Sequence, residues 1–224
     1  MTKPIDKHRI FVTGATGYVG ARLIPLLLER GHDVTALVRE SSARKVLTEC
    51  RVVVGDPLNA ETFEESVRGH DTLVQLVGVP KPSPWKGPQF RAIDGPSAMA
   101  AIQAAASTGV QHVVYVSVAH PAPIMRDYIA VRRDCEEAIR RAGLVATILR
   151  PWYILGPGHW WPLALLPVYR MLERVPATRE AATRLGLVTI RDMLAALLSS
   201  IEHPPVTKRV IEVPEIRALG RSEP

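Results

Sequence analysis

Along most of this chain, segments with the apolar pattern of a strand alternate with segments with the apolar pattern of a helix. Short runs rich in Val, Ile and Leu are each followed by a segment whose apolar residues recur every three or four positions. Continuous apolar strands separated by helices are typical of a parallel sheet that is covered on both faces. The predicted strands are residues 9–13, 33–38, 51–54, 72–77, 112–118 and 145–149, and the predicted helices are residues 21–30, 60–67, 96–108 and 127–142.

The pattern changes after residue 150. Residues 151–176 are rich in Pro and Trp, a helical pattern returns over 187–202, and residues 208–213 read as a last edge strand. We therefore predict one α/β domain spanning residues 1–224, built on a doubly wound parallel sheet. A small C-terminal cap over about 156–186 is expected to be inserted before the final helix and strand.

Three regularly spaced glycines join the first predicted strand to the first predicted helix. Gly14 can adopt backbone angles closed to other residues, Gly17 lets the main chain approach a phosphate, and Gly20 lets the helix pack closely on the strand. Because a helix N-terminus offers free amides and a partial positive charge, this turn predicts a dinucleotide site of the Rossmann type. A glycine turn without a ligand is the alternative. The turn residues assigned to the cofactor are Gly14, Thr16, Gly17, Tyr18 and Val19.

The residues after the second strand bear on which dinucleotide binds. Sites selective for NAD usually place a carboxylate about 20 residues beyond the glycines. Here that place is taken by Arg39, with Ser41 and Arg44 close behind. A guanidinium can bond two phosphate oxygens at once, so these residues predict a preference for NADP(H), with NAD(H) as the alternative. A solvated surface charge cluster would explain the same residues without a ligand.

Composition and charge restrict the classes of function that we expect for this chain. The chain is 47% hydrophobic and 22% charged, with a net charge of +6, which is typical of a globular protein with an anionic ligand. The basic residues are scattered without stacking aromatics, so nucleic-acid binding is not expected. Cys50 and Cys135 lie far apart, no apolar run approaches the ~20 residues of a membrane span, and no signal peptide precedes the first strand. We expect a cytoplasmic protein without a metal site.

Together these motifs resemble the short-chain dehydrogenase/reductase superfamily, in its extended and atypical branch with the NmrA-like proteins, NADPH-dependent isoflavone-type reductases and a complex I accessory subunit. The matching motifs are Thr13-Gly14-x-x-Gly17-x-x-Gly20, Gly55-Asp56, Leu76-Val77-Gly78, and Leu149-Arg150-Pro151 followed by Gly156-Pro157-Gly158. The resemblance implies that Gly55 and Asp56 contact the adenine. It also implies that the residues beside the nicotinamide end are Leu76, Val77, Gly78, Pro151 and Trp152.

Catalysis in that superfamily uses a Ser, a Tyr and a Lys four residues after the Tyr. The resemblance places Ser117 and Tyr128 in the first two roles, as substrate anchor and proton donor. The third position, where the family's Lys binds the cofactor ribose and lowers the Tyr pKa, is taken by Arg132, which is assigned to the cofactor and the phenol. This departure preserves a cation near the phenol but changes its shape. The alternatives are that Tyr128 is a packing residue, that Ser117 is a backbone cap, and that Arg132 pairs with Glu136.

The aromatic segment after the sixth strand is expected to pass over the nicotinamide end in this fold. Aromatic rings there would favour a flat or apolar substrate. Packing within the cap, or contact with another subunit or a membrane surface, would explain the same residues. The candidate substrate wall is Trp152, Tyr153, His159, Trp160 and Trp161.

Two functions follow from these residues. The first is an NADP(H)-dependent oxidoreductase of the atypical short-chain type, acting on a carbonyl, enone or quinone-like small molecule. The second is a redox sensor or structural subunit that binds NADP(H) without turnover, which the Arg at position 132 and the small cap favour. A monomer or homodimer without a transmembrane segment is expected, and contact with a membrane surface stays open.

Overall fold

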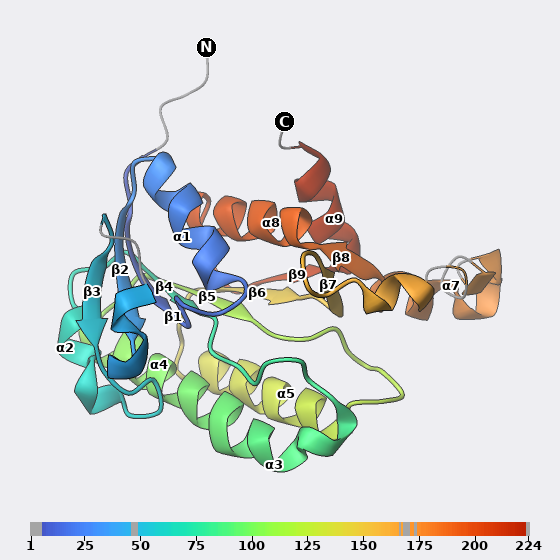
Figure 1. The fold of residues 1–224 in the computed structure, drawn as a ribbon, viewed down its shortest axis with the longest axis horizontal. Helices are drawn as coiled ribbons and strands as arrows, with labels where there is room; N and C mark the ends of the chain where they lie inside the picture. Colours follow the sequence, from blue (N-terminus) through green and yellow to red (C-terminus); the bar gives the residue numbers. More distant parts are fainter. Residues whose placement is uncertain (1–5, 46–48, 166, 168–170, 173, 223–224) are drawn as a thin grey trace.

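A parallel sheet forms the centre of the molecule (Figure 1). The computed structural model describes residues 6–45, 49–165, 167, 171–172 and 174–222. Seven strands lie in the order β3-β2-β1-β4-β5-β6-β9, and every neighbouring pair is parallel. They are β1 (Arg9–Thr13), β2 (Asp33–Val38), β3 (Arg51–Val54), β4 (Thr72–Gln75), β5 (His112–Val116), β6 (Ala146–Arg150) and β9 (Arg209–Glu212). The predicted doubly wound α/β fold is confirmed.

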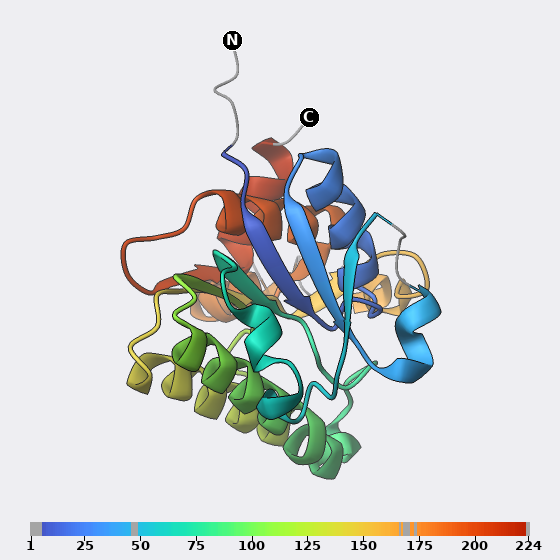
Figure 2. The ribbon, with the colours of Figure 1, turned by 90° about the vertical axis from the view of Figure 1, so that its left-hand side faces the viewer.

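Helices cover both faces of the sheet (Figures 1 and 2). Side chains of β1 alternate between the two layers, because Ile10 and Val12 pack toward α1 and α8 whereas Phe11 packs toward α4. The longer helices are α1 (Gly20–Glu29), α4 (Gly95–Thr108), α5 (Arg126–Arg141), α7 (Pro176–Arg184), α8 (Ile190–Glu202) and α9 (Val213–Ser222). Shorter turns are η1 (Glu40–Lys45), η2 (Ala60–Thr62), α2 (Glu64–Val67), η3 (Pro84–Lys86), α3 (Gly87–Gln89), η4 (Phe90–Asp94) and η5 (Trp161–Leu165).

The strand order reverses between β1 and β4. The chain runs from β1 outward to β2 and β3, then returns to β4 on the other side of β1 and continues to β5 and β6. Ligands of open α/β sheets bind in the crevice that such a reversal leaves at the carboxyl ends of the strands. The fold therefore places a site beside the loops that follow β1 and β4.

The C-terminal part differs from the predicted elements. Residues 187–189 form β8 (Leu187–Thr189), which pairs in parallel with β7 (Tyr153–Leu155) in a separate two-stranded sheet. The helix predicted from residue 187 therefore begins at Ile190, where Thr189 and Asp192 form a reciprocal capping box. The predicted edge strand over 208–213 is present as β9, and it is followed by α9, a helix that the sequence pattern did not predict. Its apolar residues Val213 and Ile216 are fully buried under α8, a contact that local periodicity did not reveal.

Two predicted strands are shorter than expected, since β4 and β5 end at residues 75 and 116. The residues beyond them leave the sheet to line the site described below. None of the helices in the described part of the chain is long and apolar enough to span a membrane.

Candidate functional site

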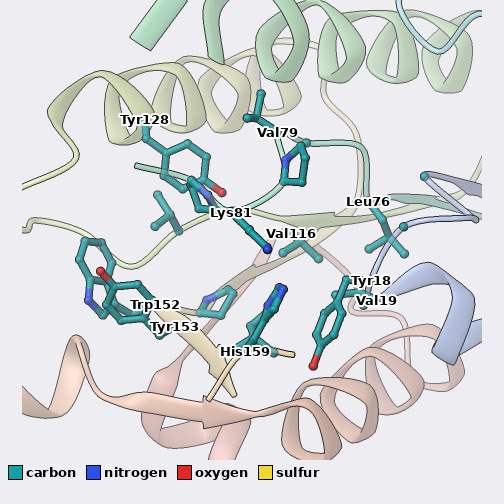
Figure 3. A pocket seen from close by; sticks show the side chains of 18 of the residues that line it. Tyr18, Val19, Leu76, Val79, Lys81, Val116, Tyr128, Trp152, Tyr153 and His159 are labelled. Atoms are coloured by element: carbon teal, nitrogen blue, oxygen red, sulfur yellow. The ribbon is translucent and has the colours of Figure 1, made fainter. Parts of the chain in front are cut away.

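A cavity of about 470 Å³ lies at the carboxyl ends of the central strands. This volume is within the range of small-molecule sites. Its walls come from the glycine turn, the loops after β4 and β5, the start of α5, and the segment after β6. Figure 3 shows the labelled lining residues Tyr18, Val19, Leu76, Val79, Lys81, Val116, Tyr128, Trp152, Tyr153 and His159.

The glycine turn forms one wall of the cavity and has the geometry predicted for it. Gly14 has a φ of +70°, and a Cβ there would lie 2.7 Å from the backbone carbon of Leu76. A Cβ on Gly20 would overlap the carbonyl oxygen of Gly14. The backbone can therefore reach both the next strand and the first turn of α1 only with glycine at these places. This cradle beside a helix N-terminus fits the pyrophosphate of a dinucleotide.

Tyr128 brings a phenol into the cavity from the first turn of α5. Its ring packs on Phe90 with centroids 4.8 Å apart, and the Arg132 guanidinium carbon lies 5.0 Å from its centroid. Burial raises the pKa of Tyr128 above its usual value of 10.0, and the nearby Arg132 charge only partly opposes this. The phenol therefore keeps its proton throughout the neutral pH range.

Arg132 is buried behind Tyr128, and carbonyl and carboxylate groups hold its guanidinium. Nη2 donates to Asp94 Oδ1 at 2.5 Å, and Nη1 donates to the Val116 carbonyl at 2.8 Å. The second Asp94 oxygen accepts from the Val79 amide at 3.0 Å. A Cβ on Gly78 would lie 2.6 Å from Nη2, so glycine there makes room for the guanidinium. The side chain of Arg132 does not reach the cavity wall that the described residues form.

Ser117 lines the cavity, yet its hydroxyl donates away from it to Glu136 Oε1 at 2.6 Å. Glu136 in turn pairs with Arg150 at 2.5 Å, and Arg150 also pairs with Glu212 at 2.9 Å. This chain of charges links α5 to β6 and β9. Because its proton is engaged by Glu136, the Ser117 hydroxyl has only acceptor lone pairs left to offer a ligand.

The segment after β6, which holds the residues predicted as a substrate wall, lines the cavity with Trp152, Tyr153 and His159. His159 stacks on Tyr18 of the glycine turn with centroids 4.3 Å apart and an interplanar angle of 12°. Trp152 and Tyr153 form an edge-to-face pair at 5.5 Å. Trp160 is 54% exposed and lies outside the lining, and the side chain of Trp161 is not among those described.

Lys81 is a lining residue that the sequence did not indicate. It has a φ of +49°, which is rare for a residue with a side chain, and its ammonium extends into the cavity (Figure 3). Lys86 Nζ holds this loop by donating to the carbonyls of Pro80 and Lys81 at 2.7 and 3.0 Å. Among the described lining residues, Lys81 is the one that carries a Lys or Arg cation. Its place in the loop after β4 is the sequence signal that could have identified Lys81 as a site residue.

The structure thus separates the predicted site residues into two groups. The residues that line the cavity are Gly14, Gly17, Tyr18, Val19, Leu76, Gly78, Ser117, Tyr128, Pro151, Trp152, Tyr153 and His159. Those outside its lining are Thr16, Arg39, Ser41, Gly55, Asp56, Val77, Arg132 and Trp160. The cavity lining thus includes most of the residues that the resemblance assigned to the nicotinamide end, and none of those assigned to the adenosine end that the structure describes.

The predicted adenosine end lies along the neighbouring strands β2 and β3. Arg39 directly follows β2 and is exposed, and the Gly55 amide donates to the Val38 carbonyl at 3.0 Å. Asp56 Oδ1 accepts from the Leu58 amide at 2.9 Å and shapes the turn after β3. The side chain of Arg44 lies outside the described residues. No cluster of three or more metal-ligating side chains occurs within the described ranges.

Comparison with known proteins agrees with this geometry. Residues 14–157 match the family model described as NAD(P)H-binding. Ceramide reductase of Caulobacter vibrioides is 27% identical over 213 residues, which are 94% of this chain and 66% of the relative. A 4-hydroxy-2-methyl-3-oxo-4-farnesyl-3,4-dihydroquinoline-1-oxide ketoreductase of Stigmatella aurantiaca is 28% identical over 170 residues, which are 66% of this chain and 51% of the relative. The chain thus spans less than two thirds of the length of these curated relatives.

Solved structures share the fold across almost the whole chain. A putative epimerase from Burkholderia cenocepacia superposes with a TM-score of 0.68 at 21% identity, covering 97% of this chain and 81% of its own. A short-chain dehydrogenase/reductase superfamily protein from Agrobacterium tumefaciens with bound NAD superposes with a TM-score of 0.66 at 18% identity, covering 94% and 82%. These superpositions show the fold, and the match of residues 14–157 to the NAD(P)H-binding model confirms the predicted NAD(P)-binding family.

Proposed function

The chain belongs to the NAD(P)H-binding family, and from this premise we propose that it is an NADP(H)-dependent oxidoreductase that reduces a carbonyl, enone or quinone-like group on an apolar substrate. One observation carries the proposal. The protonated phenol of Tyr128 lines the same cavity as Gly14 and Gly17, so a proton donor lies within reach of the cofactor cradle.

When bound, the reduced dinucleotide supplies a hydride to the electrophilic carbon of the substrate. In carbonyl reduction, Tyr128 then donates its phenolic proton to the substrate oxygen, so the C=O bond becomes a CH–OH group. Burial raises the pKa of Tyr128, so the phenol carries its proton at neutral pH and has it available to donate. Tyr128 regains its proton from solvent before the next turnover.

Arg132 acts in this proposal as a positioning residue. Its guanidinium lies over the Tyr128 ring and is anchored by Asp94 and the Val116 carbonyl, so it orients the phenol. Lys81 supplies the cation that faces the ligand, in the place between Tyr128 and the aromatic wall (Figure 3). It would bind a cofactor phosphate or polarise the substrate oxygen.

The lining and the relatives both favour an apolar substrate. Trp152, Tyr153 and Ile154 form a largely apolar wall, which suits a long-chain or polycyclic ketone. The two relatives described above are named for reactions on a ceramide and on a farnesylated ring system. We extend to this chain only the chemical class, a carbonyl compound with a large apolar portion.

The test is NADPH oxidation with a panel of quinones, enones and long-chain ketones. Tyr128→Phe should lower kcat by about 10²–10⁴ because general acid catalysis is lost, while the Kd for NADPH stays within about twofold of the parent. Tyr153→Phe is the matched control, since it removes a phenol that also lines the cavity. Equal rates in parent and Tyr128→Phe would refute the role of Tyr128.

Cofactor preference has its own test. Arg39→Asp should weaken NADPH binding about tenfold to hundredfold by removing a charge-assisted phosphate contact, and should leave NADH binding nearly unchanged. Arg221→Asp, an exposed change on α9, is the control. Equal calorimetric affinities for the two cofactors in the parent protein would contradict the preference.

A second candidate is an NADP(H)-binding sensor or structural subunit without turnover. It is favoured by the engagement of Arg132 and Ser117 with the carboxylates of Asp94 and Glu136. If NADPH binds tightly but no compound of the panel is reduced, and NADPH instead changes affinity for a protein partner, this function replaces the first.

A further inference from the structure

Three chain segments extend from the cavity lining to exposed residues, and we refer to them as the rim. They are residues 81–86, 118–126 and 158–165. Each contributes lining residues to the cavity, among them Pro82, Val118 and His159. The loop before α5 and the cap segment lie at the same end of the molecule, on either side of the sheet plane (Figure 1).

Each rim segment also exposes a large apolar side chain. Trp85 is 84% exposed, Trp160 54%, Ile124 49% and Leu163 40%. A single exposed apolar residue is common on protein surfaces. Here two tryptophans, an isoleucine and a leucine are exposed on the segments that line one cavity, which indicates a contact surface. Tryptophan in particular suits a boundary where one side is apolar and the other wet.

The charges of the rim have one sign. Residues 81–86, 118–126 and 158–165 contain the cations Lys81, Lys86 and Arg126 and no Asp or Glu. The next carboxylate, Asp127, pairs with Arg91 at 3.1 Å. The whole chain carries a net charge of +6. A surface that combines tryptophans with unopposed cations is complementary to anionic lipid headgroups above an acyl layer.

We propose that the rim binds the surface of an anionic lipid bilayer and turns the mouth of the cavity toward it. The contact is peripheral: Trp85, Ile124 and Trp160 enter the headgroup region while Arg126 faces lipid phosphates. An apolar substrate could then pass from the bilayer into the cavity without crossing water. That last step rests on the proposed function, whereas binding to the bilayer does not.

The first experiment is flotation of the full chain with vesicles of phosphatidylcholine, with and without phosphatidylglycerol. Binding is expected with the anionic vesicles and should weaken as salt screens the cations. Trp85→Ser should reduce the partition coefficient by about tenfold or more, because the buried apolar area is lost. Val206→Ser is the control, since Val206 is 94% exposed in the loop between α8 and β9.

Charge is tested separately. Arg126→Gln should weaken binding to anionic vesicles about fivefold, whereas Arg221→Gln on α9 should not. Absence of flotation at low salt, or equal losses in the rim and control variants, would overturn the proposal. A concentration-dependent dimer that Trp85→Ser abolishes would overturn it as well, by assigning the rim to a second copy of the chain.

An activity measurement distinguishes this proposal from the proposed function. With a water-soluble ketone, Trp85→Ser should turn over as the parent does, and with a long-chain ketone embedded in vesicles it should be slower by the factor seen in flotation. If no ketone is reduced but flotation behaves as expected, the proposed function fails and the bilayer contact stands. If ketones are reduced but the parent does not float, the bilayer contact fails alone.

Discussion

The ion pair between Asp94 and Arg132 gives the sharpest prediction of stability. Both side chains are buried, with relative exposures of 0% and 6%. Each Asp94 oxygen accepts from a different donor, Arg132 Nη2 at 2.5 Å and the Val79 amide at 3.0 Å. In Asp94→Asn the amide presents one acceptor and one NH₂ group, so one of the two donors loses its partner and the Arg132 charge is left uncompensated. Breaking a buried pair in this way costs about 3–5 kcal/mol.

Urea unfolding of the parent and the variant measures this cost, from the midpoint at constant m. Asp127→Asn is the matched control, because its pair with Arg91 spans 3.1 Å with both side chains more than half exposed. That change should cost less than about 1 kcal/mol. In Asp94→Asn the pKa of Tyr128 should also fall, since Asp94 raises it and Arg132 lowers it, and tyrosinate absorbance reports this. Equal costs for the two variants would refute the reasoning.

Three further predictions concern the turn, the sheet and the cavity. Gly14→Ala should abolish NADPH binding in calorimetry, because its Cβ would meet the Leu76 backbone at 2.7 Å. Gly143→Ala is the control, since Gly143 also has a positive φ but has open space around it. That variant should lose only stability, which thermal unfolding would show. Burial lowers the pKa of His112 from 6.5 to about 4, so between these pH values the unfolded state binds a proton that the folded state does not. About 3 kcal/mol of the free energy of unfolding should therefore be lost as pH falls from 6.5 to 4. The loss over the same pH range should be smaller in His112→Gln. Lys81→Met should raise KM or the Kd for NADPH about tenfold, and Lys81→Arg should restore it; unchanged constants would remove Lys81 from the site.

The sequence alone determined the features that depend on neighbours along the chain. Apolar runs of strand length, the helical period between them and the Gly14-x-x-Gly17-x-x-Gly20 turn each express a local constraint on backbone angles or on which face is buried. Those constraints were enough for the sheet and the glycine turn, whereas Tyr128 in the first turn of α5 was singled out through the family resemblance. Strand ends were less accurate, because residues after 75 and 116 leave the sheet for a cavity wall.

The tertiary structure decided what each charged group of the site does. Arg132 lies four residues after Tyr128 on one helix face, and the family resemblance assigned it as the cation that supports the cofactor and the phenol. Asp94, 38 positions away along the chain, binds it instead, and Glu136 similarly takes the proton of Ser117. Lys81 enters the cavity only because its loop adopts a φ of +49° and is tied down by Lys86. Which partner a buried charge finds depends on elements that meet through packing, and desolvation makes that partner decisive.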